Sequence, residues 1–202
     1  MRRFVILGQR ATAAPDFLLD DIAGTSGRLD VLLRSLRAAL LVSHGVRRDT
    51  IVYLVLLGGP RAPISLRFEG ATAKFLRPEE RSLGTLVKKV LGVPCESASF
   101  VDVRPGIAMA RAGLDAVLAD LGGTGRRYVL DERAADVRDV DLDGDDGVFF
   151  VGDHLGFDDA TRGALAALGA TAIGLGPVSV HAEDAVAIVN NELDRRAARP
   201  AG

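Results

Sequence analysis

The chain has 202 residues, of which 48% are hydrophobic and 26% are charged, which is ordinary for a soluble globular protein. No apolar run approaches the ~20 residues that a membrane-spanning helix needs. The single cysteine and three histidines exclude an internal disulfide and a zinc framework, so we expect a cytoplasmic protein without a metal.

The charge is distributed unevenly along the chain. Residues 1–100 contain 15 lysines and arginines and 9 acidic residues, whereas residues 101–202 contain 10 and 18, although the overall net charge is only −2. The basic first half predicts a polyanionic partner. The alternative is that these charges are scattered over solvated faces, because halves of a sequence need not be halves of a molecule.

Strands and helices alternate in the first half of the chain. Residues 4–8 predict a buried strand, and residues 12–25 an irregular loop. Residues 28–44 predict a helix that ends at Gly45, because leucines recur at helical spacing. Strands are expected at 51–57, covered on both faces, at 64–68, nearer an edge, and at 100–103, with a helix at about 78–91 before the last of them.

The alternation continues in the second half. Helices are expected at 114–121, 158–168 and about 181–196, and strands at 128–130, 148–151 and 171–175. This pattern indicates an α/β fold with a mostly parallel sheet and helices on both faces. No linker divides the chain, so a single domain is expected.

Two stretches are partial matches to known ligand-binding loops. Residues 139–145 begin like an EF-hand calcium loop, but its twelfth position, which needs a bidentate glutamate, is Phe150. Residues 174–179 contain two glycines of a dinucleotide fingerprint, but the third glycine is missing and Pro177 has no N–H for a pyrophosphate. We therefore expect a solvated acidic turn in the first case and no NAD site in the second.

Two apolar segments of the second half each lead into a glycine-containing turn. Residues 148–151 precede Gly-Asp-His-Leu-Gly at 152–156, and residues 171–173 precede Gly-Leu-Gly-Pro at 174–177. Ligands of open α/β sheets bind at the carboxyl ends of the strands, and glycine lets main-chain groups approach a ligand closely. The turns predict a small-molecule pocket built mainly of backbone, with two ordinary turns of a packed domain as the alternative.

The same turns resemble a known family. Together with Leu-Gly-Pro-Val-Ser-Val-His-Ala at 175–182 and Ile-Val-Asn-Asn-Glu-Leu-Asp at 188–194, they look like the SPOUT class of methyltransferases, and more narrowly the TrmY-type tRNA pseudouridine-54 N1-methyltransferases. Matches at 27–30, 43–49, 68–70, 78–81 and 104–107 extend the resemblance over nearly the whole chain. It implies one SPOUT domain over 1–202, with an N-terminal α/β part (about 1–125) carrying an RNA face and a cofactor-binding part with a trefoil knot (about 126–196).

The resemblance also implies a cofactor, S-adenosylmethionine, held by three loops of the C-terminal part. Carried over residue by residue, the expected contacts are Leu130 in the first loop, Gly152 in the second, and Leu175, Gly176, Pro177, Val178, Ser179 and Val180 in the third. The last helix adds Ala185, where the family often has a cysteine, so we expect packing contact only at that position.

Methyl transfer to N1 of a pseudouridine requires in-line positioning and removal of one proton. The expected proton acceptor is Asp30 or Asp16, and Arg28 is expected to stabilise the developing anion. For Asp30 the alternative is a first-turn acid favoured by the helix dipole.

Three further arginines are expected to contact RNA. Arg47 and Arg48 follow a glycine-terminated helix, and Arg34 lies on the polar face of that helix; arginine forks suit phosphate contacts. A surface salt bridge to Asp49 is the alternative for the first two.

These observations predict a homodimeric, S-adenosylmethionine-dependent enzyme that methylates N1 of a pseudouridine in RNA, with the tRNA T-loop as the expected target. Two alternatives stay open: the same chemistry on another RNA base or a free nucleoside, and a non-catalytic RNA-binding protein that keeps the fold.

Overall fold

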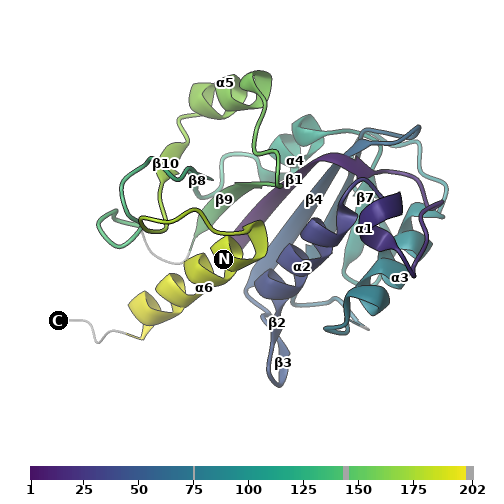
Figure 1. Cartoon of the computed structure of the whole chain (residues 1–202), viewed down its shortest axis with the longest axis horizontal. Helices are drawn as coiled ribbons and strands as arrows, with labels where there is room; N and C mark the ends of the chain where they lie inside the picture. The colour runs from purple at the N-terminus through teal and green to yellow at the C-terminus, as the bar shows by residue number, and fades with distance from the viewer. Residues whose placement is uncertain (75, 143–145, 199–202) are drawn as a thin grey trace.

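The computed structural model describes residues 1–74, 76–142 and 146–198. Within them, an eight-stranded sheet has the order β10-β8-β9-β1-β4-β5-β7-β6 (Figure 1). The first five of these strands are parallel, namely β10 (Thr171–Ile173), β8 (Arg126–Leu130), β9 (Gly147–Gly152), β1 (Arg2–Thr12) and β4 (Thr50–Gly58). The other three are antiparallel to their neighbours: β5 (Ile64–Glu69), β7 (Ile107–Ala110) and β6 (Val101–Arg104). The predicted α/β class with a mostly parallel sheet is confirmed.

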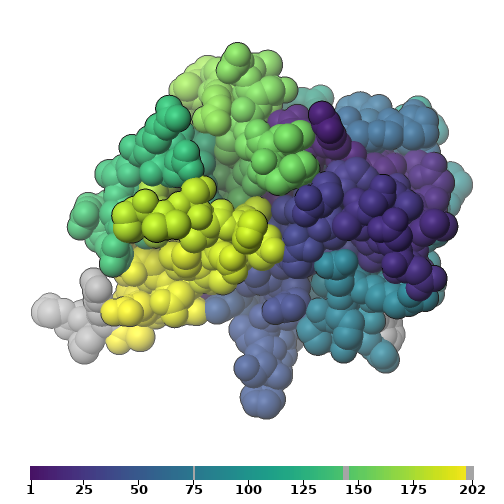
Figure 2. All heavy atoms as spheres, viewed as in Figure 1, coloured from purple at the N-terminus to yellow at the C-terminus, as the bar shows by residue number. Residues whose placement is uncertain are grey.

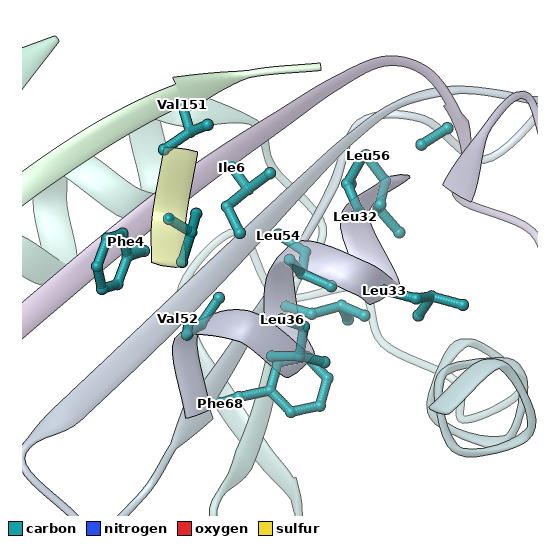
Figure 3. Close-up of a cluster of buried hydrophobic side chains, with 14 of the residues drawn as sticks. Phe4, Ile6, Leu32, Leu33, Leu36, Val52, Leu54, Leu56, Phe68 and Val151 are labelled. Atoms are coloured by element: carbon teal, nitrogen blue, oxygen red, sulfur yellow. The ribbon is translucent and has the colours of Figure 1, made fainter. Parts of the chain in front are cut away.

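Helices cover both faces of this sheet, because the apolar strands bury side chains on both sides. In β1, Phe4 and Ile6 pack in a core with α2 (Leu29–Leu40), α3 (Glu80–Leu91) and α6 (Ala182–Ala197). Val5 and Leu7 point the other way, into a second core with α4 (Leu114–Leu121) and α5 (Asp159–Ala167). Figure 3 shows the first core, in which Leu32 and Leu36 of α2 meet the side chains of β1 and β4.

Two local predictions are wrong, and one strand was not predicted. The helix expected to reach residue 44 ends at Leu40, and the chain then forms a hairpin, β2 (Leu41–Val42) and β3 (Gly45–Val46), that projects from the body (Figure 2). The loop expected at 12–25 contains the single-turn helix α1 (Ile22–Thr25). The strand β5 lies nearer an edge than β4, as expected, but it is followed outward by β7, which was not predicted because its Ile-Ala-Met-Ala sequence has no periodic signal.

The last helix is tied to the start of the chain. The Asn190 side chain accepts a hydrogen bond from Arg2 (3.2 Å) and donates to the carbonyl oxygens of Ala38 and Ala39 in α2 (3.2 and 3.3 Å). Asp194, one turn later, accepts from Arg2 at 2.6 Å. These contacts fix α6 against α2 and β1.

The stretch that begins like an EF-hand loop is only partly described by the structure. Of the acidic stretch 139–145, residues 143–145 lie outside the described residues, and Phe150 lies in β9 as expected.

In the described part of the chain, no helix is long and apolar enough to cross a membrane.

Candidate active site

A cavity of about 1120 Å³ lies at the carboxyl end of the parallel strands. The loops that follow β8, β9 and β10 form one side of it, and α2 with the first turn of α6 forms the other. Sites for single small molecules typically measure roughly 300–1,000 Å³. The cavity is thus large enough for a cofactor and part of a second molecule.

Most residues expected to hold the cofactor line this cavity. They are Leu130, Gly152, Leu175, Gly176, Val178, Ser179, Val180 and Ala185. Pro177 is exposed and is not among the lining residues. Residues from three loops and one helix, up to 55 positions apart in the sequence, therefore meet at one site.

The turn after β9 is shaped by Asp153 and by close backbone packing. The buried Asp153 carboxylate accepts hydrogen bonds from the backbone N–H groups of Gln9 and Leu155, both at 2.8 Å. A Cβ atom on Gly152 would lie only 2.8 Å from the Cα and carbonyl carbon of Gly156. Only glycine fits this position without moving the turn.

The loops after β8 and β10 are joined by backbone hydrogen bonds. Asp131 donates to the carbonyl of Ile173 at 3.0 Å, Val137 donates to that of Gly174 at 2.7 Å, and the Gly174 N–H donates to Ala135 at 2.7 Å. The main chain on this side of the cavity is therefore held in place by its own pairing, which suits a site that recognises ligands through backbone groups.

The opposite side of the cavity carries a charged cluster on α2. Arg28, which lines the cavity, is the residue before α2 and has a left-handed backbone (φ 71°). Non-glycine residues in this conformation cluster at functional sites. Its side chain donates to the Asp30 carboxylate at 3.0 and 3.2 Å.

Asp30 lies behind this wall and is not among the residues that line the cavity. Its side chain is 3% exposed and accepts a further hydrogen bond from Arg34 at 2.8 Å. Burial would raise the pKa of Asp30, but the hydrogen bonds from Arg28 and Arg34 outweigh burial and lower it. The carboxylate is therefore ionised and occupied by arginines. Asp16, the other expected proton acceptor, is exposed and does not line the cavity either.

Arg34 connects three helices. It lines the cavity, and besides Asp30 it donates to Glu183 in α6 at 2.7 Å and to Glu80 in α3 at 3.2 Å. Burial would lower the pKa of Arg34, but these carboxylates outweigh burial and raise it. Arg34 is thus a fixed cation of the cavity wall rather than a mobile surface charge.

Arg47 and Arg48 lie at the other end of the strands. β1 pairs Arg2 with Thr50 at one end and Leu7 with Gly152 at the cavity end, a separation of roughly 16 Å along the strand. Arg47 donates two hydrogen bonds to Asp194, at 2.9 and 2.6 Å, whereas Arg48 is exposed.

Asp49, the partner considered for these two arginines, contacts Arg2 at 3.5 Å. The structure therefore does not bring Arg47 and Arg48 together with the cavity of the same chain.

Sequence reasoning missed Glu183 and Asp153. Both line the cavity, and both stand inside or beside the motifs that predicted it. A role for Glu183 could not be predicted from its position, because an acid in the first turn of a helix is common for electrostatic reasons alone. Among the residues that the structure describes, no group of three or more His, Cys, Asp or Glu side chains could hold a metal ion.

The arrangement of strands and cavity has a counterpart among solved structures. The crystal structure of Archaeoglobus fulgidus Nep1 bound to S-adenosylhomocysteine superposes with a TM-score of 0.64, at 20% identity, over 98% of this chain and 99% of that one. The chain therefore shares the fold of that protein, as expected for the SPOUT class that the motifs resemble.

Sequence comparison identifies the family within this class. Residues 1–198 match the family described as "Putative SAM-dependent RNA methyltransferase". The tRNA (pseudouridine(54)-N(1))-methyltransferase of Methanosarcina acetivorans is 39% identical over 197 residues, 96% of this chain and 92% of that protein. The enzyme of the same name from Haloarcula marismortui is 36% identical over 96% of each chain. The chain belongs to this family of SAM-dependent RNA methyltransferases, as its motifs predicted.

Proposed function

We propose that the protein transfers a methyl group from S-adenosylmethionine to N1 of a pseudouridine in RNA, with position 54 of the tRNA T-loop as the target. The observation that carries the proposal is the cavity at the carboxyl end of β8, β9 and β10, which is lined by the glycine turns that carry the resemblance. The relatives named for this reaction match nearly the whole chain.

The residues present fit the methyl donor. The glycine turn at Gly152 and the paired loops after β8 and β10 offer backbone groups to a nucleoside, and Ala185 offers a small apolar surface. We assign donor contacts to Leu130, Gly152, Ala185 and the third loop, which comprises Leu175, Gly176, Pro177, Val178, Ser179 and Val180. The carboxylates of the cavity suit the positive charge of a sulfonium.

The donor supplies an already activated methyl group, so the protein chiefly positions the base and manages charge. We propose Arg28 as a catalytic residue that reaches into the cavity and stabilises the anion that develops on the base, with Asp30 as its positioning residue. Asp30 holds Arg28 through two hydrogen bonds. Arg34 contributes a second positive charge near the RNA backbone, and Arg47 and Arg48 are proposed to contact RNA further from the reacting base.

A homodimer is part of the proposal. Three apolar side chains at the cavity are exposed, namely Leu155 (49%), Val178 (72%) and Val180 (42%), which supports a partner surface beside the site. Sedimentation velocity should give twice 21.3 kDa, and substitution of Val178 by Glu should shift the mass toward one chain.

We also propose that the chain is one cytoplasmic domain whose part from about residue 126 to 196 forms a trefoil knot. The knot is proposed from the resemblance; in the sheet, the chain returns past β8 after β9 and adds β10 at the far edge.

The experiment that tests the reaction compares two T-loop stem transcripts that differ only by uridine or pseudouridine at the target position. With labelled S-adenosylmethionine, label is expected in the pseudouridine RNA alone. Label in neither RNA would refute the T-loop assignment.

The alternatives are tested by binding. If the substrate is RNA, affinity should fall steeply with salt, because phosphate contacts release counterions, whereas a free nucleoside would show little salt dependence. A calorimetric titration with S-adenosylmethionine that gives no heat would favour a non-catalytic RNA-binding protein.

A further inference from the structure

Glu183, in the first turn of α6, has a carboxylate oxygen that the fold leaves unused. Its side chain is 21% exposed and lines the cavity. Oε1 accepts the hydrogen bond from Arg34 Nε at 2.7 Å, whereas Oε2 is buried and has no hydrogen-bond partner among the described residues. A buried charged oxygen without a partner is costly to a fold. A ligand group that donates a hydrogen bond would remove this cost.

Two other carboxylates near the cavity, Asp30 behind its wall and Asp153 in the turn after β9, have no free oxygen. Both oxygens of Asp30 accept from arginines, and both oxygens of Asp153 accept from backbone N–H groups. Asp131 and Glu132 lie across the cavity on the loop after β8; Asp131 accepts from the Arg133 N–H and from Arg162, and Glu132 is exposed, so solvent can satisfy its oxygens. Glu183 thus combines a position on the charged wall with an unused acceptor.

Its position fits the reacting base. Ala182 and Ala185, on the same helix end, line the cavity where donor contact is proposed, and Arg28 and Arg34 line the wall beside it. A base bound between the arginines and the donor would therefore lie next to Glu183. The volume of about 1120 Å³ exceeds the usual range for one small molecule, so a nucleotide base has room beside the donor.

On the basis of the proposed function, we propose that Glu183 is the catalytic residue that accepts the N1 proton of the target pseudouridine. The bond from N1 to the methyl carbon forms as the bond from sulfur to that carbon breaks, and the N1 proton passes to Oε2 of Glu183. The donor leaves as the neutral thioether, S-adenosylhomocysteine. The N1–H becomes strongly acidic as N1 binds carbon, so a carboxylate is a sufficient base.

The ion pair with Arg34 keeps Glu183 ready for this role. It holds the carboxylate through Oε1, and Oε2, which is buried and has no hydrogen-bond partner among the described residues, becomes available to the substrate when the carboxylate turns toward the cavity. An acid that only interacted with the dipole of α6 could remain solvated at the helix end. An interaction with the helix dipole alone does not explain why Oε2 is buried without a partner.

The test compares Glu183→Gln with Glu80→Gln. Glutamine keeps the side-chain shape and an oxygen for Arg34 but cannot accept the proton. Glu80 also pairs with Arg34, at 3.2 Å, yet does not line this cavity, so its variant is matched for the loss of one charge beside Arg34. Single-turnover methylation of the pseudouridine transcript, affinity for S-adenosylhomocysteine and affinity for the transcript are measured for each full-length protein.

We expect Glu183→Gln to slow methyl transfer by about 100-fold or more, the usual contribution of a proton acceptor, with both affinities changed less than about threefold. Glu80→Gln should keep the wild-type rate within the same factor. In Glu183→Ala, added formate should restore part of the rate by replacing the carboxylate, which a structural role would not allow.

Three results would overturn the assignment. The first is methyl transfer by Glu183→Gln at the wild-type rate. The second is a loss of S-adenosylhomocysteine affinity in Glu183→Gln in proportion to the loss of rate, because this loss would show that Glu183 contacts the donor. Formate could fail to restore any rate in Glu183→Ala. In each case wild-type activity shows that the proposed function stands. Absence of transfer by the wild-type protein would overturn both proposals.

Discussion

Replacement of Gly152 by alanine tests whether the turn after β9 binds the donor by close backbone packing. The added Cβ would lie 2.8 Å from Cα and C of Gly156 and 3.2 Å from its oxygen. Carbon atoms pack at roughly 3.5–4.0 Å, so the two sides of the turn must separate by about 1 Å. Both residues line the cavity, and their movement changes its surface directly.

We expect Gly152→Ala to weaken S-adenosylhomocysteine binding and to slow methyl transfer on the order of 100-fold, the effect of a misplacement of about 1 Å. Isothermal titration calorimetry measures the first effect and single-turnover labelling the second. Thermal unfolding should show a moderate loss of stability, because the added Cβ meets backbone atoms of Gly156, which cannot rotate away as a side chain could.

Gly163→Ala is the matched control for this variant. Gly163 lies within α5, and a Cβ there meets nothing within 4 Å. Alanine in a helix interior should raise stability by about 0.5–1 kcal/mol and leave donor affinity unchanged. If the two alanine variants bind S-adenosylhomocysteine equally well, the turn at Gly152 does not contact the donor and the reasoning fails.

Three further predictions follow from side-chain contacts. Asp30→Asn should lower the free energy of unfolding at pH 7 by about 2 kcal/mol, since charged hydrogen bonds contribute roughly 1.5–3 kcal/mol. The folded-state pKa of Asp30 is below its usual value of 3.8, so the stability difference between wild type and variant should be complete above pH 3.8 and shrink as the pH falls below 3.8. Urea titrations that give equal stability differences at pH 7 and pH 3 would contradict this. Arg48→Ala should weaken RNA binding and reduce the salt slope by about 0.7–0.9 without changing donor affinity, and a slope equal to wild type would remove Arg48 from the RNA face. Tyr53→Phe, which loses the 2.7 Å hydrogen bond to Asp120, should cost about 1–2 kcal/mol in urea unfolding with normal methylation; unchanged stability would mean that the bond contributes nothing.

The backbone part of the site could be predicted from the sequence because it depends on local patterns. A glycine turn after an apolar strand predicts where a ligand approaches, and Gly152 and Leu175 line the cavity accordingly. The antiparallel strand β7 could not be predicted, because its four residues are buried on all sides and carry no alternation. Its pairing with β5 depends on long-range contacts, which a local sequence pattern does not predict.

The charged part of the site was less accessible to sequence reasoning. Arg34 and Glu183 are 149 positions apart, and only the packing of α6 on α2 brings them within 2.7 Å. The same packing explains why Arg47, expected on an RNA face, is paired with Asp194. Residue type and spacing indicate which side chains are polar, but not which opposite charge the fold places beside them.

The contacts between α6 and the start of the chain link donor binding to folding. Arg2 and Asp194 are 192 positions apart, and the helix that they anchor also supplies Ala185 and Glu183 to the cavity. Such distant contacts form late and slowly in folding. A ligand that needs α6 in place binds only the completed fold, so at 100 times its Kd it adds about 2.7 kcal/mol of stability. The methyl donor would then stabilise the completed fold in addition to supplying the group that is transferred.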